Sequence, residues 1–176
     1  MWGGHCLPAR GIGRVDLREQ LESVLQGRVC LMGLGNTDYG DDGFGVRLGE
    51  GLLDLGMADV ILAGTAPDRH IGTAADQDFD HLVFLDAVEF GGKPGSVVFL
   101  DAEGIASRFP QISTHKISLS VLARLIESNG ITKTWLLGVQ PESTRGGEGL
   151  SPKVRATLEV LCALLSSLKT KELPVC

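Results

Sequence analysis

The chain has 176 residues, of which 43% are hydrophobic and 22% charged, and its formal net charge at pH 7 is −6. This length and balance predict one globular domain, and the acidic charge argues against nucleic acid or anionic lipid as a partner. No run of 18 apolar residues is present, so no membrane-spanning helix is expected. The first residues also lack the apolar core of a secretory signal. We therefore expect a cytoplasmic protein.

Apolar runs alternate with helical patterns along the chain. The first run, at residues 29–34, is typical of a central parallel strand that is buried on both faces. Because only the short turn GGKPG separates the third and fourth runs, we expect the fourth strand to lie antiparallel beside its neighbour. Asp16 and Ser151 are typical helix caps. The expected strands are residues 29–34, 59–64, 81–88, 95–101 and 135–139, and the expected helices are 16–26, 44–56, 117–126 and 152–168.

Strands that alternate with helices predict an α/β fold. We expect a three-layer sandwich with a mixed, mostly parallel five-stranded sheet and helices on both faces. Residues 1–27 are expected to form an N-terminal extension with a short helix, and residues 28–170 a single α/β domain. In open sheets of this kind, ligands bind outside the carboxyl ends of the parallel strands. The loops after the strands are therefore the first candidates for a functional site.

The loop after the first run reads GLGNTDYGDD and starts at Gly33. Its first two glycines, including Gly35, match a dinucleotide-binding loop, but Asp38 stands at the third glycine position and no lysine follows. A phosphate would meet three carboxylates, and like charges about 4 Å apart repel by roughly 1 kcal/mol even in water. The loop therefore favours a cation over a nucleotide. The alternative for Asp41 and Asp42 is capping of the next helix.

Two later loops supply further candidate metal ligands. Asp86 ends the third apolar run, and His115 precedes a helix in the segment STHKIS. With Asp42 they would form a site of mixed oxygen and nitrogen ligands with open coordination positions. The alternatives are that Asp86 binds the amides of the next turn and that His115 has a capping or surface role. Spacing alone does not show that the three residues meet.

The chain contains none of the common nucleophile motifs of hydrolases. It has no GxSxG and no HExxH, and its four cysteines lie far apart without a CxxC pair. If the protein is a hydrolase, the attacking group is therefore water. Either a metal ion polarises the scissile carbonyl or lowers the pKa of the water, or a carboxylate such as Asp42 or Asp86 acts as the base. The sequence leaves these alternatives open.

Four segments, in this order, resemble the signatures of the nickel-iron hydrogenase maturation endopeptidases. They are GLGNTDYGDDGFGVRL, FLDAVEFGGKPGSV, STHKISL, and GVQPES followed by GLSP, and the resemblance covers about residues 28–168. The segment GTAPDRH and the histidine segment are most similar to the branch that matures hydrogenases of the formate hydrogenlyase kind. The resemblance thus implies a peptidase domain over residues 28–170.

The resemblance also implies a reaction and a partner. Such an enzyme removes the C-terminal tail of a [NiFe] hydrogenase large-subunit precursor in a single cut, after nickel is in place. The nickel ion is then supplied by the precursor. The alternative is a protein that does not cleave, such as a checkpoint or chaperone that recognises nickel during hydrogenase assembly.

The same resemblance assigns the site residues. Asp42, Asp86 and His115 are the implied metal ligands, and the two aspartates are also the candidates for catalysis. Some members carry Glu where this chain has Asp42. The shorter side chain moves the oxygen ligand by one methylene but leaves its chemistry unchanged. The residues expected to contact substrate are Gly35, Asn36 and Asp41.

Overall fold

The computed structural model describes residues 16–109 and 118–170. Five strands alternate with helices along this part of the chain. The strands are β1 (Val29–Leu34), β2 (Val60–Gly64), β3 (His81–Ala87), β4 (Val97–Asp101) and β5 (Lys133–Val139). The helices are α1 (Leu17–Val24), α2 (Phe44–Asp54), α3 (Asp68–Ala75), α4 (Ala102–Arg108), α5 (Leu119–Glu127) and α6 (Pro152–Thr170), with a short 3-10 helix, η1 (Gly40–Gly43), before α2.

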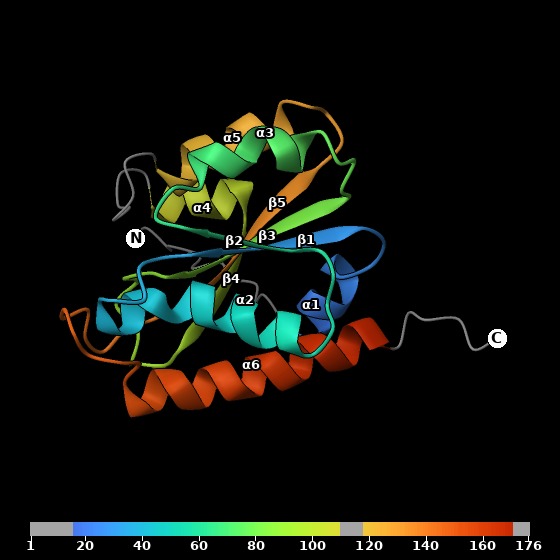
Figure 1. Cartoon of the computed structure of the whole chain (residues 1–176). Helices are drawn as coiled ribbons and strands as arrows, with labels where there is room; N and C mark the ends of the chain where they lie inside the picture. The colour runs from blue at the N-terminus through green and yellow to red at the C-terminus, as the bar shows by residue number, and fades with distance from the viewer. Residues whose placement is uncertain (1–15, 110–117, 171–176) are drawn as a thin grey trace, which may run out of the picture.

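The strands form one sheet in the order β2-β1-β3-β5-β4. Strands β2, β1, β3 and β5 are parallel, and β4 runs antiparallel to β5. Helices α3, α4 and α5 cover one face of the sheet, and α1, α2 and α6 cover the other (Figure 1). The predicted three-layer α/β fold with a mixed, mostly parallel sheet is confirmed.

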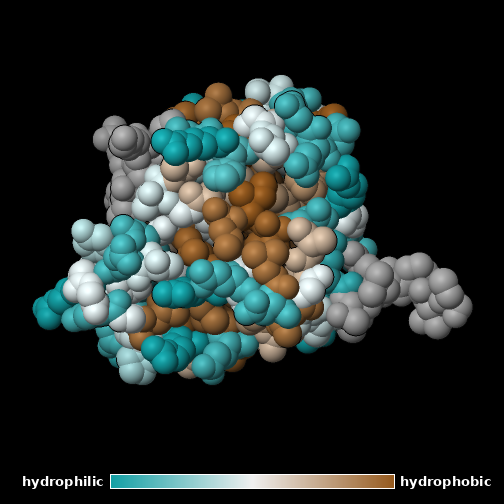
Figure 2. Space-filling model, in the orientation of Figure 1, coloured by the Kyte–Doolittle hydropathy of each residue, from teal (hydrophilic) through white to brown (hydrophobic). Residues whose placement is uncertain are grey.

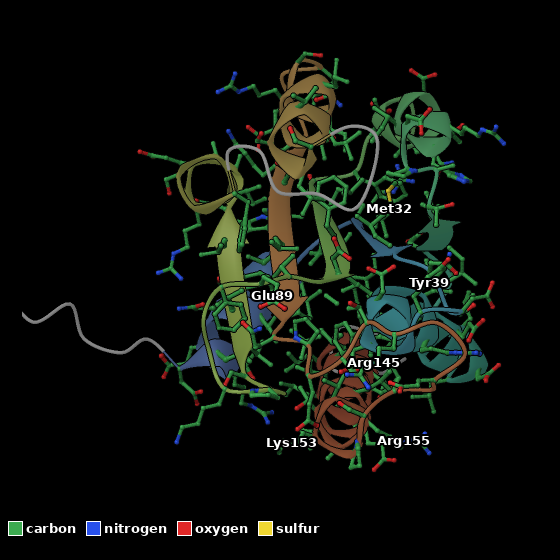
Figure 3. The ribbon with its side chains drawn as sticks, turned by 90° about the vertical axis from the view of Figure 1, so that its left-hand side faces the viewer. Met32, Tyr39, Glu89, Arg145, Lys153 and Arg155 are labelled. Carbon is green, nitrogen blue, oxygen red and sulfur yellow. The ribbon has the colours of Figure 1, made fainter. Side chains whose placement is uncertain are left out.

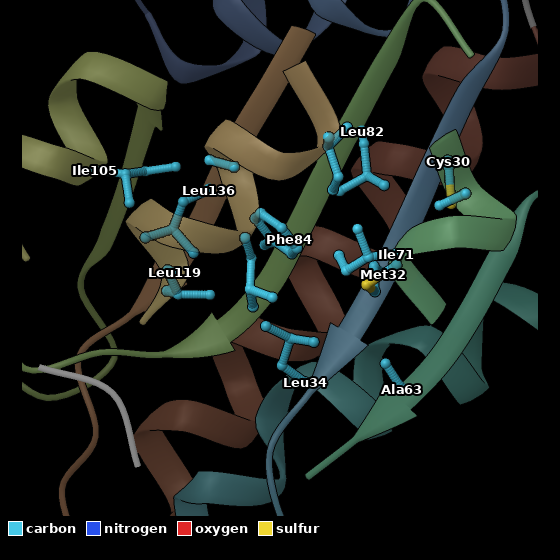
Figure 4. Packing of buried hydrophobic residues seen from close by; sticks show 14 of the residues in the cluster. Cys30, Met32, Leu34, Ala63, Ile71, Leu82, Phe84, Ile105, Leu119 and Leu136 are labelled. Carbon is cyan, nitrogen blue, oxygen red and sulfur yellow. The ribbon is translucent and has the colours of Figure 1, made fainter. Parts of the chain in front are cut away.

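Strands β1 and β3 are buried because helices cover both of their faces. Met32 and Phe84 are partners in the β1–β3 register, and both lie in the core beneath α3, α4 and α5 (Figure 4). Leu31 and Val83, one residue earlier in each strand, point to the opposite core beneath α1, α2 and α6. Continuous apolar runs are thus required here, since successive side chains alternate between two cores.

Helix α1 is an integral part of one of these cores. The Asp16 side chain caps it by accepting a hydrogen bond from the Arg18 amide at 3.4 Å, so the predicted cap is confirmed. Leu21, Val24 and Leu25 are buried in the same cluster as the apolar side chains of α6. The leucine face predicted from the sequence therefore packs on the domain.

One expectation about the sheet is wrong. The fourth strand was expected beside the third, but β5 lies between β3 and β4. The link after β3 crosses the end of β5, where the Gly95 amide donates a hydrogen bond to the Gln140 carbonyl at 2.9 Å. Helices α3 and α4 are additions to the expected elements. Among the described residues, no helix is both long and apolar enough to cross a membrane.

Candidate active site

The loop after β1 folds back on itself at Gly35. This residue has a φ of +110°, and a Cβ atom there would lie 1.7 Å from the Asp42 carbonyl oxygen. Its amide donates to the Gly64 carbonyl at the end of β2, at 3.0 Å. Glycine is therefore required for this close backbone approach. A direct contact between Gly35 and substrate stays a prediction.

Asn36 and Asp42 fix each other's position in this loop. The Asn36 amide donates to Asp42 Oδ2 at 2.8 Å, and the Asn36 side-chain oxygen accepts from the Asp38 amide at 3.0 Å. Asp42 lies in η1 and is only 8% exposed. The loop thus holds the Asp42 carboxylate in one place before any ligand arrives, as preorganised binding requires.

Asp86 lies near the carboxyl end of β3, and the packing of α2 on the strand ends brings η1 to the same edge of the sheet. A Cβ atom at Gly45 would lie 1.9 Å from the Leu85 carbonyl oxygen and 2.6 Å from that of Leu34. The beginning of α2 therefore lies directly against the carboxyl ends of β1 and β3, and η1 packs against β3. Asp86 is 3% exposed, and its Oδ1 accepts from the next amide, that of Ala87, at 2.9 Å.

The donors at this edge suit a hard or borderline divalent cation. Asp42 and Asp86 supply carboxylate oxygens from neighbouring elements, and such oxygens with an imidazole form a common mixed ligand set. The third predicted ligand, His115, lies outside the described residues. Within residues 16–109 and 118–170, no three His, Cys, Asp or Glu side chains are grouped so as to hold a metal ion. Convergence of the three predicted ligands stays a prediction.

Asp41, next to Asp42 in the chain, has a different set of contacts. Its side chain is completely buried, and its Oδ2 accepts from the amides of Glu142 and Ser143 at 2.8 and 3.0 Å. The Ser151 amide donates to Oδ1 at 2.6 Å, and the Ser151 hydroxyl donates to Oδ2 at 2.9 Å. These bonds fix the loop between β5 and α6. A part for Asp41 in substrate binding stays a prediction.

The environment of Asp41 favours its charged form. Burial alone would raise the pKa of the Asp41 carboxyl, but the hydrogen bonds from Ser151, Ser143 and Glu142 outweigh it and hold the pKa below its usual value. Ser151 was predicted as the cap of the last helix. Its carbonyl accepts the Arg155 amide at 2.9 Å in the first turn of α6, while its hydroxyl donates to Asp41.

Backbone hydrogen bonds join the same two loops into one unit. The Asp41 amide donates to the Ser143 carbonyl at 2.8 Å, and the Gly147 amide donates to the Asp38 carbonyl at 2.8 Å. Tyr39 is half exposed and lies against Gly146. Figure 3 shows Tyr39, Glu89 and Arg145 on the side of the molecule where the parallel strands end.

Gln140 is a further residue at this edge, to which the sequence analysis assigned no role. It is 5% exposed, and its side-chain oxygen accepts from the amides of Phe90 and Gly92 at 3.0 and 3.1 Å. Its side-chain nitrogen donates to the Glu89 carboxylate. Gln140 thus fixes the loop that follows Asp86. The sequence does indicate Gln140 as a candidate, because it directly follows the last apolar run, and ligand-binding residues gather at strand ends.

The described cysteines lie away from this edge or are unreactive. Burial, followed by the charge of Asp59, raises the pKa of the Cys30 thiol to about 12. Burial, followed by the charge of Asp54, also raises the pKa of Cys162 on α6. A thiol with a raised pKa holds little nucleophilic thiolate at neutral pH. Neither residue has the environment of a catalytic cysteine.

Comparison with solved structures defines the class of protein. The [NiFe] hydrogenase maturation protease HycI from Thermococcus kodakarensis KOD1 superimposes with a TM-score of 0.76 and 32% sequence identity, over 86% of this chain and 99% of that chain. The hydrogenase maturating endopeptidase HybD from Escherichia coli superimposes with a TM-score of 0.69 and 29% identity, over 83% of this chain and 94% of that one. The fold is thus that of an α/β endopeptidase.

Comparison of the sequence identifies the family. The family model described as hydrogenase maturation protease matches residues 47–167, and the chain belongs to this family. The hydrogenase 2 maturation protease of Escherichia coli K12 is 32% identical over 153 residues, which cover 80% of this chain and 92% of the relative. The hydrogenase 3 maturation protease of the same organism is also 32% identical, over 114 residues, 64% of this chain and 72% of the relative. The family consists of endopeptidases, so the prediction of an enzyme is confirmed over that of a non-cleaving checkpoint.

Proposed function

We propose that this endopeptidase removes the C-terminal tail of a [NiFe] hydrogenase large-subunit precursor in a single cut, once nickel is in place. Membership of the hydrogenase maturation proteases supports this substrate class. The observation that carries the proposal is the pair of buried carboxylates at the carboxyl edge of the sheet: Asp86 lies near the end of β3, and Asp42 lies in η1, which packs against β3.

The nickel ion is proposed to belong to the substrate. Asp42, Asp86 and His115 would supply three ligands, of which two are carboxylates. Tight resident zinc sites hold four protein ligands, or three and a water, and often use thiolates or several histidines. A three-ligand site of this kind is better suited to completing the coordination of an ion that the precursor already holds. Recognition of that ion then makes cleavage depend on nickel insertion.

The chain's own part in hydrolysis follows from where its carboxylates lie. The bound ion supplies positive charge next to the scissile peptide. Asp42 is fixed by the Asn36 amide, and Asp86 follows a fully buried stretch of β3, so neither carboxylate has to be ordered during the reaction. The attacking group is water. Either the ion activates the carbonyl or the water, or one of the two aspartates accepts the proton from water.

Asp41 and Gln140 are proposed as positioning residues. Asp41 fixes the loop between β5 and α6, and Gln140 fixes the loop after Asp86. Both loops border the edge where the precursor would bind. Gly35 and Asn36 are proposed to contact the substrate from the site loop.

The domain boundaries are part of the proposal. Residues 28–170 form the peptidase domain, and residues 1–27 form an extension whose helix α1 packs against α6.

The branch of the family is proposed from the segment GTAPDRH, which favours a large subunit of the formate hydrogenlyase kind. The proteases for hydrogenase 2 and for hydrogenase 3 are each 32% identical to this chain over the residues they match, so percentage identity does not distinguish the two groups. Assays with precursors of both kinds decide between them.

The decisive experiment offers the purified protein a large-subunit precursor with and without nickel, and follows the precursor mass. We expect one shorter product from the nickel-loaded precursor alone, and little metal in the protein purified without chelator. Asp42→Asn, Asp86→Asn and His115→Ala should each reduce cleavage at least about 100-fold while the protein stays folded. Asp38→Asn, which changes an exposed carboxylate of the same loop, is the matched control and should cleave normally.

Two results would contradict the proposal. Stoichiometric zinc together with cleavage of the nickel-free precursor would make the protein a conventional metallopeptidase. Binding of the nickel-loaded precursor without any change in its mass would leave only a recognition function.

A further inference from the structure

In the part of the chain that the structure describes, strand β2 forms an open edge of the sheet. It pairs with β1 on one side and stands at the end of the strand order. The Leu31 amide donates to the Asp59 carbonyl at 2.9 Å, and Leu31 and Val60 are partners in the register. Backbone groups alternate in direction along a strand. The N–H and C=O groups of Val60 and Leu62 therefore point away from β1, toward the open edge.

The side chains of β2 make this edge unusual. The strand reads VILAG and contains no charged residue and no proline, the features with which proteins commonly protect an open edge. Leu62 is 38% exposed, and Val60 and Ile61 are half-buried. Figure 2 shows an apolar patch in the middle of this face, between α3 above and α2 below, where Figure 1 places β2.

The edge is continuous with the candidate active site. Strand β2 ends at Gly64, whose carbonyl accepts the Gly35 amide of the site loop. The neighbour of β2 is β1, the strand that leads into this loop, whereas the opposite edge strand, β4, is separated from β1 by β3 and β5. A chain paired with β2 would therefore run along the sheet to the loop that carries Asp42.

We propose that an extended segment of the hydrogenase precursor next to the scissile bond pairs with β2 as an additional strand. This inference rests on the proposed function, since it names how the same site holds its polypeptide substrate. Backbone hydrogen bonds to Val60 and Leu62 give affinity for an extended chain of many sequences. The apolar side chains along β2 give the segment an apolar surface to cover.

A second copy of this chain is a less suitable occupant. Five strand residues span roughly 17 Å. Pairing of two such edges would bury far less than the roughly 1,200 Å² of a small stable interface. A substrate has to bind only until it is cut, so a short edge next to the site is sufficient.

The test compares two substitutions at one position. Leu62→Pro removes the outward N–H, for which the described residues provide no hydrogen-bond acceptor, and proline is tolerated on edge strands. Leu62→Ala is the matched control, since it removes the same side chain and keeps the N–H. With nickel-loaded precursor, we expect Leu62→Pro to raise KM up to about tenfold, the upper end of the effect of losing one hydrogen bond, and to change kcat little. Leu62→Ala should change KM less than about threefold.

A measurement on the unmodified protein does not depend on the folding of a variant. A synthetic peptide that spans the cleavage site and carries no nickel is added to the full chain, and amide exchange is followed by NMR. We expect slower exchange of the Val60 and Leu62 amides, while the exposed amides of β4 stay unchanged.

The outcomes separate this inference from the proposed function. If the unmodified protein cleaves precursor while Leu62→Pro and Leu62→Ala have equal KM values, or the peptide leaves both amides unprotected, strand pairing is wrong and the function stands. If these amides are already protected in the free protein, another part of the chain or a second copy covers β2, and the inference is wrong. Sedimentation then distinguishes a second copy of the protein from another part of the same chain, since only the second copy increases the mass of the particle. If no precursor is cleaved, the proposed function itself fails.

Discussion

Asp41 and Asp42 are adjacent buried carboxylates, but their side chains accept hydrogen bonds from different parts of the chain. The Asp41 side chain receives four hydrogen bonds from residues that lie 101 to 110 positions later in the chain. The Asp42 side chain accepts from Asn36 within its own loop and lies beside the end of β3. One aspartate therefore connects two loops, while its neighbour is held at the edge where the metal is proposed to bind.

Replacement of Asp41 should lower stability more than that of any exposed acid in the same loop. Asp41→Asn replaces one accepting oxygen with an NH₂ group that faces a donor. We expect the free energy of unfolding to fall by about 2–3 kcal/mol, the size of hydrogen bonds to a buried charge. Urea unfolding measures the change. Asp38→Asn should change stability by less than about 0.5 kcal/mol, and equal losses in both variants would show that the Asp41 hydrogen bonds contribute no special stability.

The lowered pKa of Asp41 should make its contribution to the free energy of unfolding depend on pH. Its pKa in the folded protein lies below the unfolded value, which is about 3.9 for a free aspartate. A group with a lowered pKa contributes stability that is complete above the unfolded pKa and is lost as the pH falls through the folded pKa. The difference in unfolding free energy between the unmodified protein and Asp41→Asn should therefore be constant from pH 5 to 7 and shrink below about pH 4. A difference that grows on acidification would contradict this account.

At the scale of elements, the contact between α2 and the strand ends forms the site. Gly45 lets the first turn of α2 lie directly on the Leu85 carbonyl, so that η1 is placed beside Asp86. No side chain can be accommodated there without moving the helix, because the nearest atoms belong to the backbone. The position of Asp42 relative to Asp86 is thus a property of helix packing.

Gly45→Ala should separate these elements. Its Cβ would lie 1.9 Å from a backbone oxygen, and we expect a loss of about 2–3 kcal/mol in unfolding free energy and reduced cleavage. Gly51→Ala, in the same helix, is the control, because its Cβ would approach only the Cys162 sulfur, at 3.1 Å. There the gain in helix propensity, up to about 1 kcal/mol, should offset the tight contact. Thermal unfolding and precursor cleavage measure both effects, and equal behaviour of the two variants would contradict the account.

The sequence predicts those elements whose burial leaves a long pattern. Strand β1 and strand β3 are continuous apolar runs, and the apolar spacing of α5 is regular. Helices α3 and α4 left no such pattern, because α3 buries only Ile71 and Ala74, and α4 only Ile105. The partner of β4 was not predictable from the length of its link. The end of the third apolar run predicted that Asp86 lies at the carboxyl edge of the sheet, as the structure shows. The contacts of Asp41 could not be predicted, because its hydrogen-bond donors lie in a distant loop.

At the scale of the whole molecule, the two cores meet across a single sheet, and α1 belongs to one of them. Leu21, Val24 and Leu25 of the α1 region are buried with residues of α6. The N-terminal 27 residues therefore combine a helix that the core includes with residues 1–14, which carry none of the family signatures.

Two truncations should separate these parts. Deletion of residues 1–14 should leave stability and precursor cleavage within about twofold of the full chain. Deletion of residues 1–27 should cost roughly 5 kcal/mol, since it removes three buried apolar side chains, Leu21, Val24 and Leu25, whose burial is worth about 1.5–3 kcal/mol each. Thermal unfolding and cleavage kinetics measure both. A protein without residues 1–14 that folds but fails to cleave would show that this segment contacts the substrate.

The hydrogen bonds to the Asp41 side chain can form only late in the synthesis of the chain. Its donors follow it by up to 110 residues, which at about 5–20 residues per second takes the ribosome roughly 5 to 20 s. Until Glu142, Ser143 and Ser151 have been made, the Asp41 carboxylate is hydrated by water, and the loop that carries it lacks the hydrogen bonds that join it to the loop before α6. A chain that ends before α6 therefore lacks the Ser151 hydrogen bonds, and we expect proteolytic activity only once the start of α6 has joined the domain.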